Sequence, residues 1–270
     1  MTPIEFFLFI AIGCAIGFLA GLFGVGGGVL IVPLLIFFYE YSGISPAIMT
    51  HMAIGTSLFV VVFASLMSAY QHNKQKNIDW RAVFVLGFSS ALTALAMTRL
   101  AADLSGRLLQ VIFALVVLIT ALIMLMESDV KAQRKMEAPS RLNLLGFGGL
   151  GLMAGVVSAL TGVGGGVFVI PIMYNFLKMP IKLAIGTSSA AIVITALFSV
   201  TGYIVNGLNI PDLPAWSIGF VDLQRGIVLA IGSVLLARAG AYVSFKTHPL
   251  RLKKLFALFV ILISIYILVK

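Results

Sequence analysis

A glycine-rich pattern occurs twice in this chain, at corresponding positions of its two halves. Both copies read Gly-Val-Gly-Gly-Gly, at Gly24–Gly28 and at Gly162–Gly166. Each copy is followed by four apolar residues and a proline, Pro33 in the first half and Pro171 in the second. Glycine and proline both disfavour a continuous helix, and here they stand inside apolar sequence. The chain is therefore predicted to have two related halves, each with a broken apolar helix.

The composition places the chain in a lipid bilayer. Hydrophobic residues make up 61% of it and charged residues 10%, and apolar runs long enough to span a membrane fill most of the sequence. The formal net charge is +9, but the basic residues lie in short loops, as the positive-inside rule expects, and form no polar face for nucleic acid. We expect an all-α integral membrane protein.

The apolar segments divide the chain into a first membrane repeat at 1–126, a charged linker at 127–141 and a second membrane repeat at 142–270. Each repeat is expected to hold about five membrane segments, of which the second is too short to span alone. We read the first segment as a retained span, because no basic residues precede it as in a cleaved signal. The expected segments include residues 4–23, 28–38, 47–71, 80–98, 110–126, 183–205, 226–244 and 255–269.

The distribution of Lys and Arg predicts the topology. If each glycine-rich hairpin enters and leaves the membrane on one side, thirteen basic residues share one side and four the other. Eight simple crossings would divide them almost evenly. An odd number of segments per half makes the halves inverted-topology repeats, as in many secondary transporters. We expect both termini outside, the linker in the cytoplasm and the protein in the inner membrane.

The glycine loops are the predicted binding site. Paired glycine-rich interruptions in two halves are typical of a transporter site near the middle of the bilayer. Glycine exposes backbone N–H groups, and a helix N-terminus carries partial positive charge, so such loops suit an anion. The alternative is that the glycines only permit close helix packing. The candidates are Gly24, Gly26, Gly27, Gly28, Gly162, Gly164, Gly165 and Gly166.

A Gly-Thr-Ser motif also occurs in both halves, at Gly55–Ser57 and Gly186–Ser188. It begins about nine residues into its helix, roughly 13 Å deep, which is near the middle of the bilayer. Its hydroxyls are expected to face the glycine loops and donate to a substrate, although such groups also bond their own helix or a neighbour. The candidates are Thr56, Ser57, Thr187 and Ser188, with Ser189 weaker.

Three basic residues are possible parts of an anion vestibule: His51, Lys182 and Arg238. The alternative is that they reach the interface and contact lipid headgroups. All nine acidic residues fall in loops or at the ends of spans, so we expect no buried carboxylate, which disfavours cation transport. No metal-spaced cluster or enzyme motif occurs, so no cofactor, metal or catalytic residue is predicted.

The glycine motif occurs twice, and each copy is followed by Gly-Thr-Ser. With this pattern the chain resembles the sulfite exporter TauE/SafE family of permeases over essentially its whole length. The one difference at the loops is Phe23 in the first copy against Thr161 in the second. The resemblance implies transport of sulfite, sulfoacetate or a related sulfur-containing or organic anion. The alternatives are an anion channel with a glycine-lined filter and a membrane-embedded sulfur-handling protein. A stripe of Gly13, Gly17 and Gly21 serves either a homodimer or packing within a monomer.

Overall fold

The computed structural model describes residues 2–125, 141–211 and 213–246, with single residues between 258 and 267. These ranges hold nine α-helices and one short pair of strands. Seven of the helices described there are long and apolar enough to cross a membrane. The prediction of an all-α integral membrane protein is confirmed. The expected linker, apart from Arg141, and most of the segment 255–269 lie outside the described residues.

Five helices form the described part of the first half. They are α1 (Pro3–Phe23), α2 (Gly28–Tyr41), α3 (Pro46–Lys74), α4 (Trp80–Asp103) and α5 (Gly106–Leu125). Polar side chains begin several of them, since the first backbone N–H groups of a helix need acceptors. Thr2 and Glu5 form a capping box at α1, and the Asp79 side chain accepts hydrogen bonds from the first turn of α4.

Four helices and two strands form the described part of the second half. The helices are α6 (Arg141–Thr161), α7 (Gly166–Asn175), α8 (Ile181–Gly207) and α9 (Leu223–Lys246). The strands β1 (Ser217–Ile218) and β2 (Val221–Asp222) pair in antiparallel fashion just before α9. This strand pair was not predicted, because two-residue strands leave no periodic pattern in a sequence.

The short helices after the glycine loops differ from the expectation in one respect. Pro33 does not interrupt α2, which runs on to Tyr41, and Pro171 likewise lies inside α7. A proline inside a helix removes one backbone hydrogen bond. The surrounding helices hold α2 in place all the same, and six of its residues are buried. The break in the first apolar segment is therefore made by the glycines alone.

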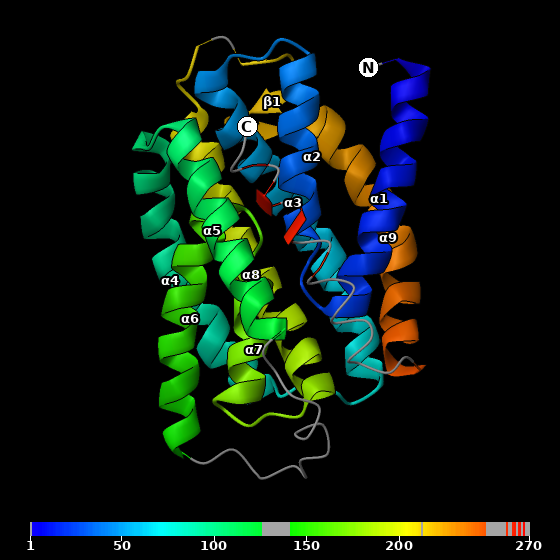
Figure 1. Ribbon diagram of the computed structural model, residues 1–270, viewed down its shortest axis with the longest axis vertical. Coiled ribbons are helices and arrows are strands. Elements are labelled where there is room, and N and C mark those ends of the chain that lie inside the picture. Colours follow the sequence, from blue (N-terminus) through cyan, green and yellow to red (C-terminus); the bar gives the residue numbers. More distant parts are fainter. Residues whose placement is uncertain are drawn as a thin grey trace.

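The bundle is arranged around α3 and α8, which contact each other and are its most buried spanning helices. In Figure 1, α1 and α9 pack together on one side, and α4 packs against α6 on the other. In the same view α1 runs downward from the N-terminus, whereas α6 begins at the bottom and runs upward. Each of these outer pairs joins one helix from the first half to one from the second.

The glycine stripe of α1 faces α9 within the same chain. A Cβ on Gly17 would lie 2.0 Å from the carbonyl oxygen of Ser233, and one on Gly21 would lie 1.9 Å from that of Ala237. On the other side, a Cβ on Gly155 would lie 2.2 Å from the Ser90 carbonyl oxygen. These glycines let two helix backbones approach closely. Of the two roles considered for the stripe, the structure supports internal packing.

Candidate functional site

The two glycine loops share one backbone conformation. Glycines at the first, third and fourth positions of each motif have positive φ, which strains any residue with a Cβ. The φ values are +68°, +79° and +81° at Gly24, Gly26 and Gly27, and +71°, +78° and +82° at Gly162, Gly164 and Gly165. The sequence repeat is therefore a repeat of backbone geometry.

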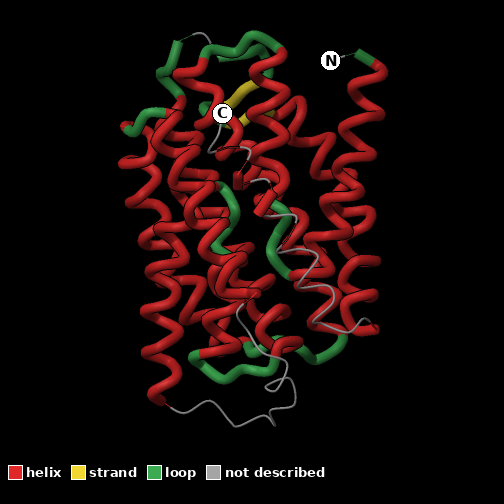
Figure 2. Tube along the Cα trace, viewed as in Figure 1, coloured by secondary structure: helices red, strands yellow, loops and turns green. Residues whose placement is uncertain are grey.

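The loops lie inside the bundle and contact each other. Figure 2 shows them as two short breaks between helices, well away from the loops at either end of the molecule. A Cβ on Gly28 would lie 2.5 Å from the carbonyl oxygen of Gly162, and one on Gly166 would lie 3.2 Å from Cα of Val25. The structure thus brings the predicted glycines of both halves together in one buried place.

Each loop presents unused backbone donors at the start of a helix. Within the described residues, the N–H groups of Val25–Val29 and of Val163–Val167 donate no hydrogen bond. Those of Gly24 and Gly162, in contrast, donate to the end of the preceding helix. The free groups lie at or just before the N-termini of α2 and α7, where the helix dipole adds partial positive charge. Such an arrangement can bind an anion.

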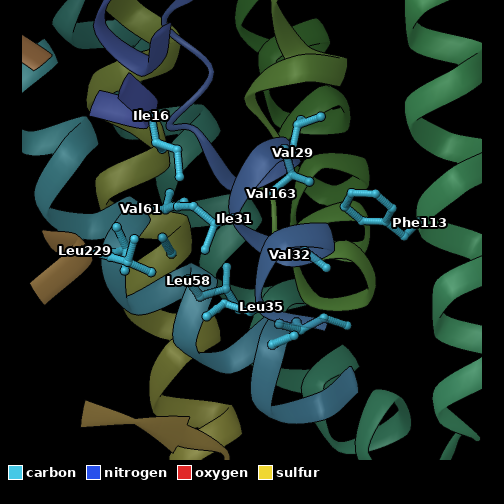
Figure 3. Close-up of a cluster of buried hydrophobic side chains, with 14 of the residues drawn as sticks. Ile16, Val29, Ile31, Val32, Leu35, Leu58, Val61, Phe113, Val163 and Leu229 are labelled. Atoms are coloured by element: carbon cyan, nitrogen blue, oxygen red, sulfur yellow. The ribbon is translucent and has the colours of Figure 1, made fainter. Parts of the chain in front are cut away.

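The side chains around the loops are mostly apolar. A Cβ on Gly26 would lie 2.9 Å from Cγ1 of Val61, and one on Gly164 would lie 2.8 Å from Cγ2 of Ile192. Figure 3 shows Val61 among the buried side chains of this region, with Val29 and Val163. A low local dielectric strengthens any hydrogen bond that forms to the free N–H groups.

The threonines of the two Gly-Thr-Ser motifs do not face the glycine loops, which corrects the prediction. The Oγ1 atom of Thr56 accepts a hydrogen bond from the backbone N–H of Asp222 at 2.9 Å. The Oγ1 atom of Thr187 accepts one from the backbone N–H of Asp79 at 3.0 Å. Both aspartates directly precede a spanning helix, α9 or α4. The threonines therefore anchor the starts of two helices.

The glycines of these motifs allow the same two loops to approach. A Cβ on Gly55 would lie 2.5 Å from the carbonyl oxygen of Phe220, and one on Gly186 would lie 2.0 Å from that of Asn77. Each carbonyl belongs to the residue two positions before the anchored aspartate. Gly-Thr is thus a docking motif for a helix start.

The serine of the motif behaves differently in the two halves. The hydroxyl of Ser57 donates to the Gly162 carbonyl oxygen at 2.8 Å and so contacts the second glycine loop as predicted. Ser188 is fully buried, and its hydroxyl has no partner among the described residues. Successive residues of an α-helix point about 100° apart, so the threonine and its neighbouring serine cannot face the same partner.

A buried carboxylate is present, contrary to the expectation. Asp222 is 1% exposed, and its Oδ2 atom lies 2.8 Å from Nη1 of Arg225. The Tyr39 hydroxyl donates to the same oxygen at 3.3 Å. Asp222 lies at the end of a span, as the sequence indicated. It is nevertheless buried, because Tyr39 and Thr56 pack against it. Its charge is compensated by Arg225.

The three basic candidates lie in different surroundings. His51 is buried, and its Nε2 atom lies 3.2 Å and 3.1 Å from the carbonyl oxygens of Ala101 and Leu104 at the end of α4. Its ring also stacks on Phe220. The side chain of His51 is therefore enclosed by protein and not exposed on the surface of the bundle. Lys182 and Arg238 are exposed.

Two polar residues near the first glycine loop were missed. Ser65 and Ser68 lie one turn apart on α3, the helix that carries the first Gly-Thr-Ser motif, and both are buried. The signal that was available is the spacing of serines at positions 57, 65 and 68, eight and three residues apart, which places them on one side of an apolar helix. Serines are common in membrane helices, so the pattern alone does not single them out.

This fold, a bundle of spanning helices enclosing two opposed broken-helix loops, defines a multi-pass membrane transporter. The chain belongs to the sulfite exporter TauE/SafE family, whose pattern matches residues 9–267. The predicted family and the prediction of a transporter rather than an enzyme are confirmed. No solved structure matches the chain.

Relatives similar over the whole chain carry transporter names. The chain is 31% identical over 269 residues to a "Probable membrane transporter protein" of Haemophilus influenzae, covering 97% of this chain and 98% of the relative. It is 29% identical over 247 residues to a protein of that description from Methanocaldococcus jannaschii, covering 91% and 89%. A shorter match, 37% identical over 101 residues, covers 36% of this chain and 21% of "Sulfite exporter TauE/SafE family protein 5" of Arabidopsis thaliana.

Proposed function

We propose that this transporter is a permease for a small anion, namely sulfite, sulfoacetate or a related sulfur-containing or organic anion. The observation that carries the proposal is the pair of buried glycine loops, whose free N–H groups at Val25–Val29 and Val163–Val167 meet inside the bundle. Two helix N-termini at one buried place favour a negative charge there. The name of the plant relative, which contains "Sulfite exporter", supports the substrate class.

The surrounding charges agree with an anion. The buried carboxylate of Asp222 is neutralised by Arg225, so it adds no uncompensated negative charge to the core. A buried carboxylate without a partner would instead have pointed to a cation or proton site. Among the described residues, no group of three or more His, Cys, Asp or Glu side chains is placed to hold a metal ion.

The mechanism we propose is alternating access between two inverted repeats, residues 1–126 and 142–270, with the termini outside and the protein in the inner membrane. Three features support it. α1 and α6 run in opposite directions in Figure 1. The outer helix pairs α1–α9 and α6–α4 each join the two halves. The hydrogen bond Thr56–Asp222 joins a threonine of the first half to an aspartate of the second, and Thr187–Asp79 joins the equivalent residues with the two halves interchanged. Such an arrangement lets one half rock against the other.

The test is flux in liposomes that contain the purified protein. Radiolabelled sulfite is expected to accumulate against an internal pool of unlabelled sulfite, with a rate that saturates. A channel gives neither counterflow nor a saturating, slow turnover, so linear flux without exchange would establish that alternative. No flux of any anion under an imposed potential would overturn the proposal.

A control addresses the remaining alternative, a sulfur-handling protein that uses its thiol. Cys14 is the one cysteine of the chain and is half-buried in α1. Full transport by Cys14→Ser is expected, because serine is close to cysteine in size. Loss of activity with unchanged thermal stability would favour the thiol-dependent alternative instead.

A further inference from the structure

Hydroxyl groups gather beside the first glycine loop. The Oγ atom of Ser65 lies 2.9 Å from the position that a Cβ on Gly26 would take, and the Oγ atom of Ser189 lies 3.2 Å from the corresponding position on Gly24. The hydroxyls of Ser189 and Ser68 are 3.1 Å apart. The three serines come from α3 and α8, the two central helices.

Ser65 is the unusual member of this group. It is 1% exposed, and its hydroxyl has no hydrogen-bond partner among the described residues. Ser189, in contrast, also donates to the carbonyl oxygen of Ile185 in its own helix. A buried hydroxyl without a partner costs free energy, and such groups in proteins are few. This one lies beside Gly26, within the run of free backbone N–H groups.

Two of these three serines, Ser65 and Ser189, have no hydroxyl counterpart in the other half, whereas Ser68 corresponds to Ser199. When the two Gly-Thr-Ser copies are aligned, Ala196 takes the place of Ser65, and Leu58 takes that of Ser189. The nearest side chains to a Cβ on Gly162 are those of Val32 and Ile54. The two loops therefore share a backbone but differ in the hydroxyls beside them, since Ser65 and Ser189 lie by the first loop and Ser57 donates to the Gly162 carbonyl oxygen of the second.

We propose that the substrate anion binds at the first glycine loop, between the free N–H groups of Val25–Val29 and the hydroxyl of Ser65, and that this subsite takes a singly charged oxyanion group. The Ser68–Ser189 pair lies beside it and can reorient to donate. This inference rests on the proposed function and adds to it both the location of the site and the charge of the group that binds.

The restriction to one negative charge follows from the donors. The nearest neighbours of Gly24 and Gly26 are Ile185, Ser189, Ser65, Val61 and Ile192, none of them charged. The cost of removing an ion from water rises with the square of its charge, so a doubly charged group costs about four times as much as a singly charged one. Neutral N–H and O–H donors therefore favour a sulfonate, a hydrogen sulfite or a carboxylate over sulfate.

The experiment compares Ser65→Ala with Ser199→Ala in the detergent-purified protein. Both serines are buried in a central helix, but the hydroxyl of Ser199 has a partner, Ser158, at 3.1 Å. The readout is thermal stabilisation by methanesulfonate or by sulfite, which follows occupancy of the folded state. Sulfite uptake into liposomes is the second readout.

Ser65→Ala is expected to raise the concentration of methanesulfonate needed for half-maximal stabilisation about tenfold or more, since a hydrogen bond to a charged group is lost. Its unfolding temperature without ligand is expected not to fall, because the hydroxyl has no protein partner to lose. Ser199→Ala is expected to bind methanesulfonate as the wild type does. The concentration needed for half-maximal stabilisation is expected to be at least about tenfold higher for sulfate than for methanesulfonate.

Each contrary result has one meaning. Equal effects of Ser65→Ala and Ser199→Ala on methanesulfonate binding would overturn the location of the subsite, while wild-type transport would leave the proposed function standing. Equal stabilisation by sulfate and methanesulfonate would overturn the inference that the subsite prefers a singly charged group. No stabilisation and no flux with the wild type would overturn the proposed function and this inference together. If Ser65→Ala fails to fold, Ser65→Cys, which keeps the size and weakens the donor, repeats the comparison.

Discussion

Thr56 accepts a hydrogen bond from the backbone N–H of Asp222, with 2.9 Å between the oxygen and the nitrogen, across the boundary between the two halves of the chain. Thr187, in the second half, likewise accepts a hydrogen bond from the backbone N–H of Asp79 in the first half. Each half therefore holds the start of a spanning helix that belongs to the other. The repeated Gly-Thr pair is a structural joint, which changes the expected effect of mutating it.

Thr56→Ala and Thr187→Ala are each expected to lower the free energy of unfolding by about 1–3 kcal/mol, because a backbone N–H loses its acceptor. Thermal unfolding in detergent measures the effect. Thr56→Ser and Thr187→Ser keep the hydroxyl and are expected to retain most of the stability. An alanine variant that binds substrate more weakly at unchanged stability would instead place the threonine in the binding site.

Removing Arg225 is expected to destabilise the protein by about 3 kcal/mol, since the carboxylate of Asp222 would stay buried without its cation. The double variant Asp222→Asn/Arg225→Ala is the control. Asparagine also caps helix N-termini and carries no charge. We expect the double variant to be more stable than Arg225→Ala alone in the same unfolding assay. The reverse order would show that the ion pair is not what Arg225 contributes.

Gly28→Ala is expected to abolish transport and to destabilise the protein by about 1–3 kcal/mol, the usual range for overpacking. The added Cβ would lie 2.5 Å from the Gly162 carbonyl oxygen and 2.6 Å from Cα of Val163, both backbone atoms that cannot turn aside. Gly149→Ala on α6 is the matched control, because a Cβ there meets nothing within 4 Å. It is expected to transport normally and to be as stable as the wild type or slightly more so. Normal transport by Gly28→Ala would contradict the contact between the loops.

His51 and Lys182 occupy equivalent positions one turn before the two Gly-Thr-Ser motifs, yet different effects are expected. His51→Ala should cost about 1–3 kcal/mol of stability, because the carbonyl oxygens of Ala101 and Leu104 lose a buried donor. Lys182→Ala should change stability by no more than about 0.5 kcal/mol, since the side chain is exposed. Unfolding temperatures of the two variants check this. Equal losses would indicate that the contacts of Lys182 contribute as much to stability as those of His51.

The features that could be predicted from the sequence are those that depend on local chemistry. The apolar runs predict spanning helices, since a bilayer leaves few other ways to pair the backbone. The glycine motif predicts a break near Gly26 and Gly164, because these positions need positive φ. The predicted interruption at Pro33 was wrong, because α2 continues past this proline and is stabilised by the helices packed around it. The positive-inside count remains a prediction about topology.

The sequence by itself determined the membrane class, the two-half organisation and the positions of the glycine loops, because composition, repetition and backbone freedom are properties of neighbouring residues. Only the tertiary structure decided which hydroxyls face those loops. Thr56 and Ser57 are adjacent in the chain, but one bonds Asp222 and the other bonds Gly162. Burial of Asp222 likewise depends on Thr56 and Tyr39, more than a hundred residues away in the chain. The hydroxyl of Ser65 lies beside Gly26, which belongs to the helix break of the same half. A side chain's partner is set by the packing of distant helices, which the residue type alone does not specify.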